Sequence, residues 1–390
     1  MSSLEKKVAQ SFIDIADAIE TGNFGKKVRV GLTLFGSEHG VEELVKGAHL
    51  AASDLFEIVL IGPEVETHLE NVVVASEEEQ YDKMEELLGS GYISSCVTLH
   101  YNFPIGVSTV GRVITPALGK EMFIATTTGT SATTRTEAMF KNALYGISAA
   151  KACGVKNPTV GILNVDNARG VERHLQQLKT NGYDINFAQS QRSDGGVVMR
   201  GNDLMLGSVD VMVCDSLTGN ILMKLFSAFS SGGNIETLGY GYGPGIGFDY
   251  DKCVCIISRA SGASVISKAI VYAYELAAGD VINVVKEEKS KADAAGYEKI
   301  YEEIKASSAP KAAVSKPKVE VAKEVVSFDI SGIDIMDLDN AVDVLLSNQI
   351  YAESGMGCTG PIVLVSEANS KKAMEILAKE GYTSSDAPSC

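Results

Sequence analysis

One cysteine lies in a loop whose composition suits a reactive thiol. Cys358 is part of Ser354-Gly-Met-Gly-Cys-Thr-Gly-Pro361, between two segments that are predicted to be strands. Glycine permits positive φ and close approach of the backbone, so several N–H groups can converge there and favour the thiolate over the thiol. The thiolate is the form that accepts an acyl group. The alternative is a tight turn that contains a small apolar residue.

A second cysteine and an arginine border another candidate site. Cys96 lies in the apolar run Ile93–His100, which predicts a buried strand, and a loop with glycine and hydroxyl groups follows this run. Open α/β sheets bind ligands where strands end in such loops. Arg112 is predicted to lie in this loop region, where its guanidinium could clamp an anion. Cys96 is a candidate reactive thiol, with a buried core cysteine as the alternative.

A dense run of hydroxyl side chains precedes a predicted helix. Its sequence is Thr126-Thr-Thr-Gly-Thr-Ser-Ala-Thr-Thr-Arg135. The free N–H groups and the dipole of a helix N-terminus can bind phosphate, whereas N-capping would use only one or two of these hydroxyls. The run is not a Walker A loop, because the sequence contains no GxxxxGK[ST]. The predicted anion ligands are Thr128, Gly129, Thr130, Ser131 and Arg135.

A third polar segment follows the apolar run Val209–Cys214. Asp215, Ser216, Thr218 and Asn220 would lie at the carboxyl edge of a sheet, beside a helix N-terminus, where they could orient a polar substrate. The alternative assigns Asn220 a capping role. The later run Gly239–Gly247 is predicted to be a flexible or tightly turning loop and not a nucleotide fingerprint, because no register matches GxGxxG.

The composition is that of a globular enzyme. The chain has 390 residues, 45% of them hydrophobic, and a formal net charge of −16 that disfavours nucleic acid as a partner. No run of apolar residues in the sequence is long enough to span a bilayer. The seven cysteines, an odd number, argue against a secreted disulfide scaffold, and no zinc signature is present. We therefore expect a cytoplasmic protein that contacts neither nucleic acid nor membrane.

The order of short β-branched runs and longer amphipathic segments predicts four regions. An N-terminal helix (1–27) precedes an α/β domain (28–286) with a largely parallel sheet wrapped by helices. A charged, partly helical linker (287–328) rich in Pro, Ser and Lys then leads to a small α/β module (329–390). The predicted strands of the large domain are Val28–Phe35, Glu57–Ile61, Thr159–Asn164, Val209–Cys214 and Cys253–Ser258. Its predicted helices are Val41–Ser53, Glu77–Leu88, Arg135–Ala152, Ala168–Asn181, Asn220–Ser230 and Ala263–Ala278.

The large domain resembles the phosphate acyltransferases of fatty-acid and phospholipid synthesis. The segment DVMVCDSLTGNILMK is similar to that family's strand–turn–helix block ending in Thr-Gly-Asn, and FGSEHGVEELVKGA, NPTVGILNV and CIISRASGAS are weaker matches in the right order. The resemblance implies a three-layer sheet of the isocitrate/isopropylmalate dehydrogenase-like type. With the linker and the SGMGCTGP module, the whole chain resembles the alpha subunits of protein C in glycine, sarcosine and betaine reductase complexes.

This second resemblance implies an acyltransferase that works with two partners. A ketoacyl-synthase-like beta subunit and a carboxymethylated selenoprotein A would supply an acetyl thioester, and inorganic phosphate would cleave it to acetyl phosphate. No metal or nicotinamide cofactor is expected, and Cys358 would carry the acetyl group with Cys96 as the second candidate. Two alternatives remain open at this point: a non-catalytic scaffold that docks the other subunits, and an NAD-dependent dehydrogenase of related fold.

Overall fold

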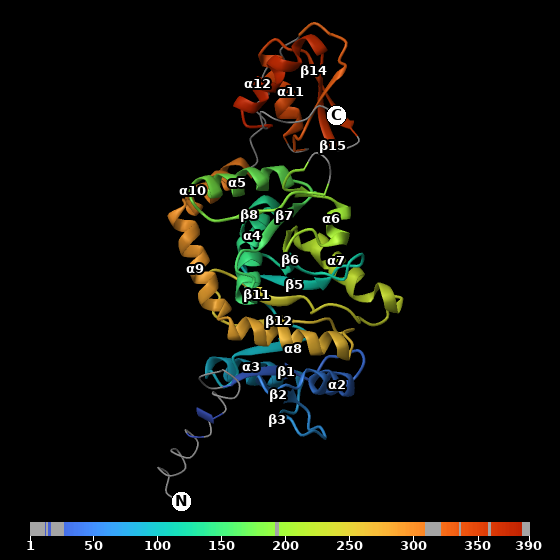
Figure 1. Ribbon diagram of the computed structural model, residues 1–390, viewed down its shortest axis with the longest axis vertical. Helices are drawn as coiled ribbons and strands as arrows, with labels where there is room; N and C mark the ends of the chain where they lie inside the picture. Colours follow the sequence, from blue (N-terminus) through green and yellow to red (C-terminus); the bar gives the residue numbers. More distant parts are fainter. Residues whose placement is uncertain are drawn as a thin grey trace, which may run out of the picture.

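A large mixed sheet runs through the main body of the computed structural model (Figure 1). The structure describes residues 12, 15, 16, 27–191, 195–308, 321–334, 337–357 and 360–383. Within them the sheet has 12 strands in the order β3-β2-β1-β4-β12-β11-β5-β6-β10-β7-β8, with β9 beside β7. The strands are β1 (Val28–Thr33), β2 (Phe56–Gly62), β3 (Glu70–Val73), β4 (Ser95–Thr98), β5 (Ser108–Ile114), β6 (Glu121–Gly129), β7 (Thr159–Leu163), β8 (Asn186–Phe187), β9 (Val198–Met199), β10 (Val211–Val213), β11 (Gly243–Ile246) and β12 (Val254–Ile256).

The sheet consists of two parallel halves joined by antiparallel strands. One half contains β3, β2, β1, β4 and β12, and the other contains β6, β10, β7, β8 and β9. Between them β11 pairs antiparallel with both β12 and β5, and β5 pairs antiparallel with β6. The junction of the two halves is therefore the place where the regular pattern of crossover connections is interrupted.

Helices cover both faces of the sheet. Along β6, Phe123 and Ala125 face one core, whereas Met122 and Ile124 face another, as the alternation of side chains along a strand requires. The three-layer α/β architecture predicted from the sequence is confirmed. The first face is covered by α2 (Val41–Ala51), α4 (Arg135–Ala152), α5 (Ala168–Thr180) and α8 (Ala263–Ala278), and the second by α3 (Glu77–Gly89), α6 (Gly201–Leu206) and α7 (Ser216–Ala228), which the short helix η1 (Phe229–Ser231) extends.

The glycine-rich run predicted to be a loop contains a central strand, so that prediction was wrong. β11 lies in the middle of the sheet. Its glycines are required because neighbouring atoms approach its backbone closely, and not because the segment is mobile. Gly243 has φ +80°, and a Cβ there would lie 1.8 Å from the carbonyl oxygen of Val110. A Cβ on Gly245 would lie 2.2 Å from the ring of Phe103. Glycine at these positions lets β11 fit between its neighbours.

Two helices extend the main body beyond the predicted domain boundary. The boundary after residue 286 falls inside α9 (Val281–Ala294), and α10 (Tyr297–Ser308) follows it. Both helices pack into the main core through apolar side chains such as Ile300 and Ile304, which are fully buried although charged residues surround them in the sequence. The chain turns between the two helices at Gly296, which has φ +83°, so much of the segment predicted to be a partly helical linker belongs to the main body.

The C-terminal module has its own sheet and core. Its strands β13 (Phe328–Ser331), β15 (Gly360–Val365) and β14 (Ala352–Gly357) pair antiparallel in that order. Arg173 of α5 connects the module to the main body by an ion pair with Asp337 at 3.1 Å and a hydrogen bond to the carbonyl of Gly381. The helices of the module are α11 (Leu338–Ser347), η2 (Glu367–Asn369) and α12 (Ser370–Lys379).

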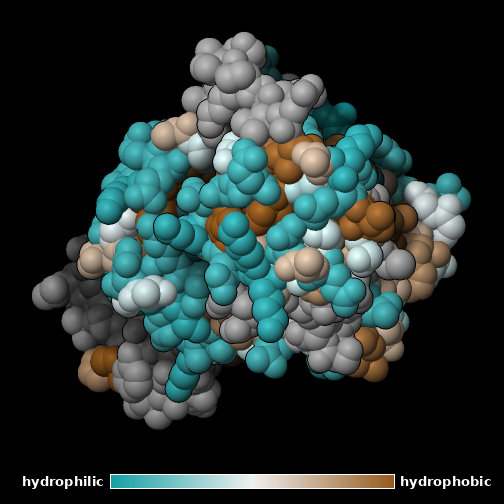
Figure 2. All heavy atoms as spheres, turned by 90° about the horizontal axis from the view of Figure 1, so that it is seen from above, coloured by the Kyte–Doolittle hydropathy of each residue, from teal (hydrophilic) through white to brown (hydrophobic). Residues whose placement is uncertain are grey.

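The surface seen from the module end is mostly hydrophilic. Figure 2 shows hydrophobic side chains there only in small groups between hydrophilic ones. Among the described residues, no helix is both long enough and apolar enough to span a bilayer.

Candidate active site

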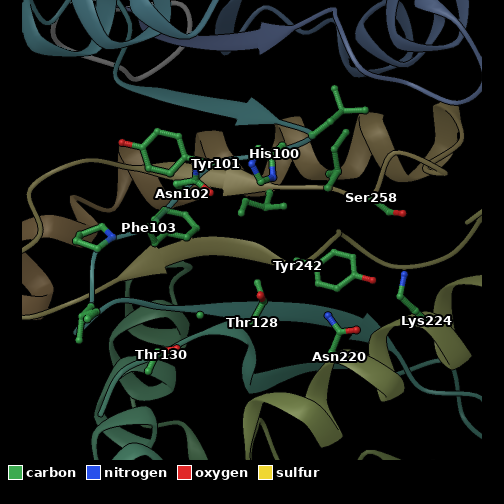
Figure 3. A pocket seen from close by; sticks show the side chains of 16 residues that line it. His100, Tyr101, Asn102, Phe103, Thr128, Thr130, Asn220, Lys224, Tyr242 and Ser258 are labelled. Carbon is green, nitrogen blue, oxygen red and sulfur yellow. The ribbon is translucent and has the colours of Figure 1, made fainter. Parts of the chain in front are cut away.

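A pocket of about 470 Å³ opens at the junction of the two halves of the sheet (Figure 3). One wall is the loop 99–105 that follows β4, and another is the segment 256–258 at the end of β12. The opposite side consists of residues 128–130 at the end of β6 together with Asn220 and Lys224 of α7, and Tyr242 lies between the two sides. Residues from both halves of the sheet therefore meet in this pocket.

The hydroxyl run before α4 divides into groups with different roles. Thr128, Gly129 and Thr130 line the pocket. Ser131 is buried, and its hydroxyl donates a hydrogen bond to Oδ1 of Asn142 at 2.8 Å, so it stabilises the loop. Arg135 is exposed and pairs with Asp166 at 3.0 Å. Of the five predicted anion ligands in this run, the structure brings three together at the pocket.

The turn before α7 caps the helix and presents one residue to the pocket. Asp215 accepts hydrogen bonds from the backbone N–H of Thr218 at 3.1 Å and from its hydroxyl at 2.6 Å, so Asp215 is the N-cap and not Asn220. The helix therefore begins at Ser216, four residues before the predicted start. A Cβ on Gly219 would lie 1.7 Å from the carbonyl oxygen of Thr126, so glycine allows α7 to contact β6. Asn220, in the next position, lines the pocket.

Tyr242 and Lys224 line the pocket but were not among the candidates named from the sequence. Tyr242 is 5% exposed, and its buried hydroxyl has no hydrogen-bond partner among the residues that the structure describes. Figure 3 shows this hydroxyl directed toward Lys224, whose Nζ lies 5.9 Å from the centre of the tyrosine ring. The hydroxyl of Thr127 donates to the backbone carbonyl of Tyr242 at 3.0 Å and so helps to place it. In the sequence, Lys224 could have been found as a candidate from its position one helical turn after Asn220.

The pocket is suited to an anion with several oxygen atoms. Lys224 brings a positive charge, and among the described residues none that lines the pocket is Asp or Glu. Thr128, Thr130, Asn220 and Ser258 add polar side chains, and the unpaired Tyr242 hydroxyl is a donor whose burial costs free energy until a partner binds. Within the described residues, no three His, Cys, Asp or Glu side chains are grouped so that they could hold a metal ion.

Arg112 lies in strand β5, away from the pocket. Its guanidinium pairs with Glu275 and Glu121, and it lies 4.3 Å from the centre of the Tyr240 ring. Burial lowers the pKa of Arg112, but the charges of Glu275 and Glu121 outweigh it and raise the pKa overall. The guanidinium that was predicted to clamp an anion is already occupied by two carboxylates.

We expect Arg112→Met to lower the free energy of unfolding by about 2 kcal/mol, because it leaves two carboxylates facing each other without their cation. Phosphate binding should stay within about twofold of the unmodified protein, since the residue lies outside the pocket. Urea unfolding and calorimetric titration with phosphate would measure these two quantities. Arg135→Met, which removes an exposed ion pair, is the matched control and should cost less than about 1 kcal/mol. Lost phosphate binding at unchanged stability would restore the clamp role to Arg112.

Cys96 is a core residue of β4. It is 0% exposed and shares a core cluster with Ile93 and with Met84 of α3, and its Sγ would lie 2.8 Å from a Cβ placed on Gly31. Burial raises the pKa of its thiol, so the neutral form prevails. The structure therefore separates Cys96 from the pocket, in agreement with the core alternative. Cys358 lies outside the described residues.

Comparison with known proteins identifies the family. A family model described as fatty acid synthesis protein matches residues 28–364. The chain is 60% identical over 384 residues, 98% of its length and 99% of the relative's, to the glycine/sarcosine/betaine reductase complex component C subunit alpha of Peptoclostridium acidaminophilum. The chain belongs to this family of component C alpha subunits.

More distant relatives of this chain are phosphate acyltransferases. The enzyme of Thermotoga petrophila is 28% identical over 234 residues, 51% of this chain and 67% of the relative. Among solved structures, a branched-chain phosphotransacylase from Enterococcus faecalis matches 64% of this chain and 99% of its own with a TM-score of 0.45 and 15% identity. The family resemblance predicted from the sequence is confirmed.

Proposed function

We propose that this subunit transfers an acetyl group from a cysteine thioester to inorganic phosphate, which yields acetyl phosphate. Two findings support the proposal together. The chain is related to proteins named phosphate acyltransferases, and the pocket at the junction of the two halves of the sheet combines a positive charge with polar side chains. Neither a metal ion nor a nicotinamide is needed for this reaction, and none is proposed.

The observation that carries the proposal is the buried, unpaired hydroxyl of Tyr242 beside Lys224. A buried donor without a partner is unfavourable, and a phosphate oxygen would satisfy it. Lys224 would bind the same anion by charge, and Asn220 and Thr130 would donate to its other oxygens. Held in this way, phosphate would direct one oxygen toward a thioester carbon that enters the pocket.

Positioning and charge stabilisation would provide most of the rate enhancement. Phosphate is an oxyanion at neutral pH, and a thiolate is a good leaving group, so the reaction needs little activation of either reactant. The donors that bind phosphate would also stabilise the negative oxygen of the tetrahedral intermediate. This use of the pocket agrees with its content of hydroxyl, amide and ammonium groups.

The acetyl group would arrive on Cys358 of the C-terminal module. Residues 309–327 join α10 to β13, a length that reaches about 60 Å when fully extended. Such a tether would allow the module to visit both the pocket and another subunit. The partners that we propose are a ketoacyl-synthase-like beta subunit and a carboxymethylated selenoprotein A, in a cytoplasmic hetero-oligomer; the related protein from Peptoclostridium is named as a component of a reductase complex.

Isotope exchange tests the proposal. The protein should move labelled phosphate into acetyl phosphate, and Tyr242→Phe should weaken apparent phosphate affinity about tenfold, the effect of losing one hydrogen bond to a charged group. Tyr297→Phe is the matched control, because the Tyr297 hydroxyl is also buried and unpaired but lies in the core outside the pocket. No exchange by the unmodified protein, with assembly of the complex lost when the pocket is altered, would favour a scaffold role.

A further inference from the structure

A buried carboxyl group lies directly behind the pocket. Glu236 is 5% exposed and belongs to the segment between η1 and β11. Its backbone is held at both sides by the loop after β12: its N–H donates to the carbonyl of Ala260, and its carbonyl accepts from the N–H of Gly262, each at 2.9 Å. The position of Glu236 is therefore coupled to the segment that supplies Ser258 to the pocket.

Hydroxyl groups surround this carboxyl. Ser261 donates to Oε2 of Glu236 at 3.1 Å, and the hydroxyls of Ser258 and Ser227 lie close enough to the carboxyl to lower its pKa. Oγ of Ser258 accepts a hydrogen bond from the N–H of Ala260 at 3.1 Å, which leaves its own proton free to be donated. Ser258 thus lines the pocket on one side and acts on the Glu236 carboxyl on the other.

Groups that line the pocket influence the ionisation of Glu236. Burial raises its pKa above the usual glutamate range, whereas the three serine hydroxyls and the charge of Lys224 on α7 act in the opposite direction. Burial and the nearby Glu236 both raise the pKa of Tyr242. Among the described residues, the charge of Lys224 thus acts on this carboxyl, and this carboxyl acts in turn on Tyr242. An anion bound beside Lys224 would oppose ionisation of Glu236 further.

We propose that Glu236 stores the proton of the acyl transfer: it becomes protonated when phosphate dianion occupies the pocket, and it passes this proton through the Ser258 hydroxyl to the departing sulfur. The inference rests on the proposed function. Because Glu236 acts through Ser258 and does not line the pocket, it is a positioning residue.

The transfer of atoms and protons balances. A phosphate oxygen forms a bond to the acyl carbon, and the carbon–sulfur bond breaks with its electron pair on sulfur. Ser258 gives its proton to the thiolate and receives one from Glu236, which becomes a carboxylate. In the reverse direction, the carboxylate takes the proton of the thiol through Ser258, and the resulting thiolate attacks the acyl phosphate.

Two measurements on Glu236→Gln test this inference. Calorimetric titration with inorganic phosphate in two buffers of different ionisation enthalpy gives the protons taken up per phosphate bound. The unmodified protein should take up more protons than the variant. In the exchange assay, kcat should fall about 100-fold, while KM for phosphate changes less than about threefold. Glu236→Asp, which keeps a carboxyl, should recover part of both effects. Glu288→Gln, at a buried glutamate of α9, should change neither measurement.

The outcomes separate this inference from the proposed function. Equal proton uptake by the unmodified protein and Glu236→Gln, or equal kcat in an active enzyme, would overturn the role of Glu236 and leave acyl transfer in place. Proton uptake that depends on Glu236 in a protein without exchange activity would contradict acyl transfer and support the proton-storing role. If Glu236→Gln does not fold, Glu236→Asp decides the same comparison. A protein that does not bind phosphate at all would contradict both.

Discussion

Acetyl phosphate formation should fall about 100-fold when Lys224 is replaced by methionine, because the ammonium would otherwise stabilise both the bound phosphate and the oxyanion of the intermediate. Methionine keeps the length and the apolar part of the side chain, so the change removes mainly the charge. Lys224 is exposed, and its replacement should leave the unfolding transition unchanged. The measurement is the rate of label exchange between phosphate and acetyl phosphate at saturating and limiting phosphate.

Lys46→Met is the matched control for this experiment. Lys46 lines a separate surface pocket beside α2, so its loss removes the same charge from the protein but not from the candidate site. Exchange by this variant should equal that of the unmodified protein. Equal losses in the two variants would mean that overall charge, rather than the pocket, controls the reaction.

The acetyl adduct should disappear completely in Cys358→Ser, because a serine hydroxyl does not form a thioester. After incubation with acetyl phosphate, intact-protein mass spectrometry should detect one added acetyl group in the unmodified protein. Hydroxylamine should remove it, and peptide mapping should place it on Cys358. Exchange of labelled phosphate should be lost together with the adduct.

Cys96→Ala provides the comparison for the thiol. The residue is buried in the core, so the variant should lose some stability but keep the adduct in its folded fraction. Full exchange activity in Cys358→Ser would contradict the carrier mechanism. An adduct on Cys96 would contradict the assignment of that cysteine to the core.

Several elements were predictable because they depend on local sequence. The helices Arg135–Ala152 and Ala263–Ala278 have the predicted bounds. Both segments are rich in alanine and contain no proline, which are properties of the chain itself. By contrast, β11 was missed, because its glycines resemble a loop and are explained only by the carbonyl of Val110 and the ring of Phe103 that approach them.

The candidate site shows the same division. Hydroxyl residues before a helix marked Thr128 and Thr130 in advance, whereas the same composition did not distinguish them from Ser131, which bonds to Asn142 in the core. Arg112 was misjudged because its partner Glu275 is 163 positions away in the chain. A pattern of neighbouring residues in the sequence cannot predict an ion pair between residues so far apart in the chain.

By itself the sequence determined the family, the alternation of strands and helices, and the segments in which polar side chains follow apolar runs. These properties depend on residue type and short-range spacing. Only the tertiary structure decided which of those side chains share a pocket, that Tyr242 is buried there without a partner, and that Glu236 lies behind Ser258. The physical reason is that packing between segments distant in the chain decides which polar groups are buried and which partners they have. The free energy of a polar group depends on this burial and on these partners.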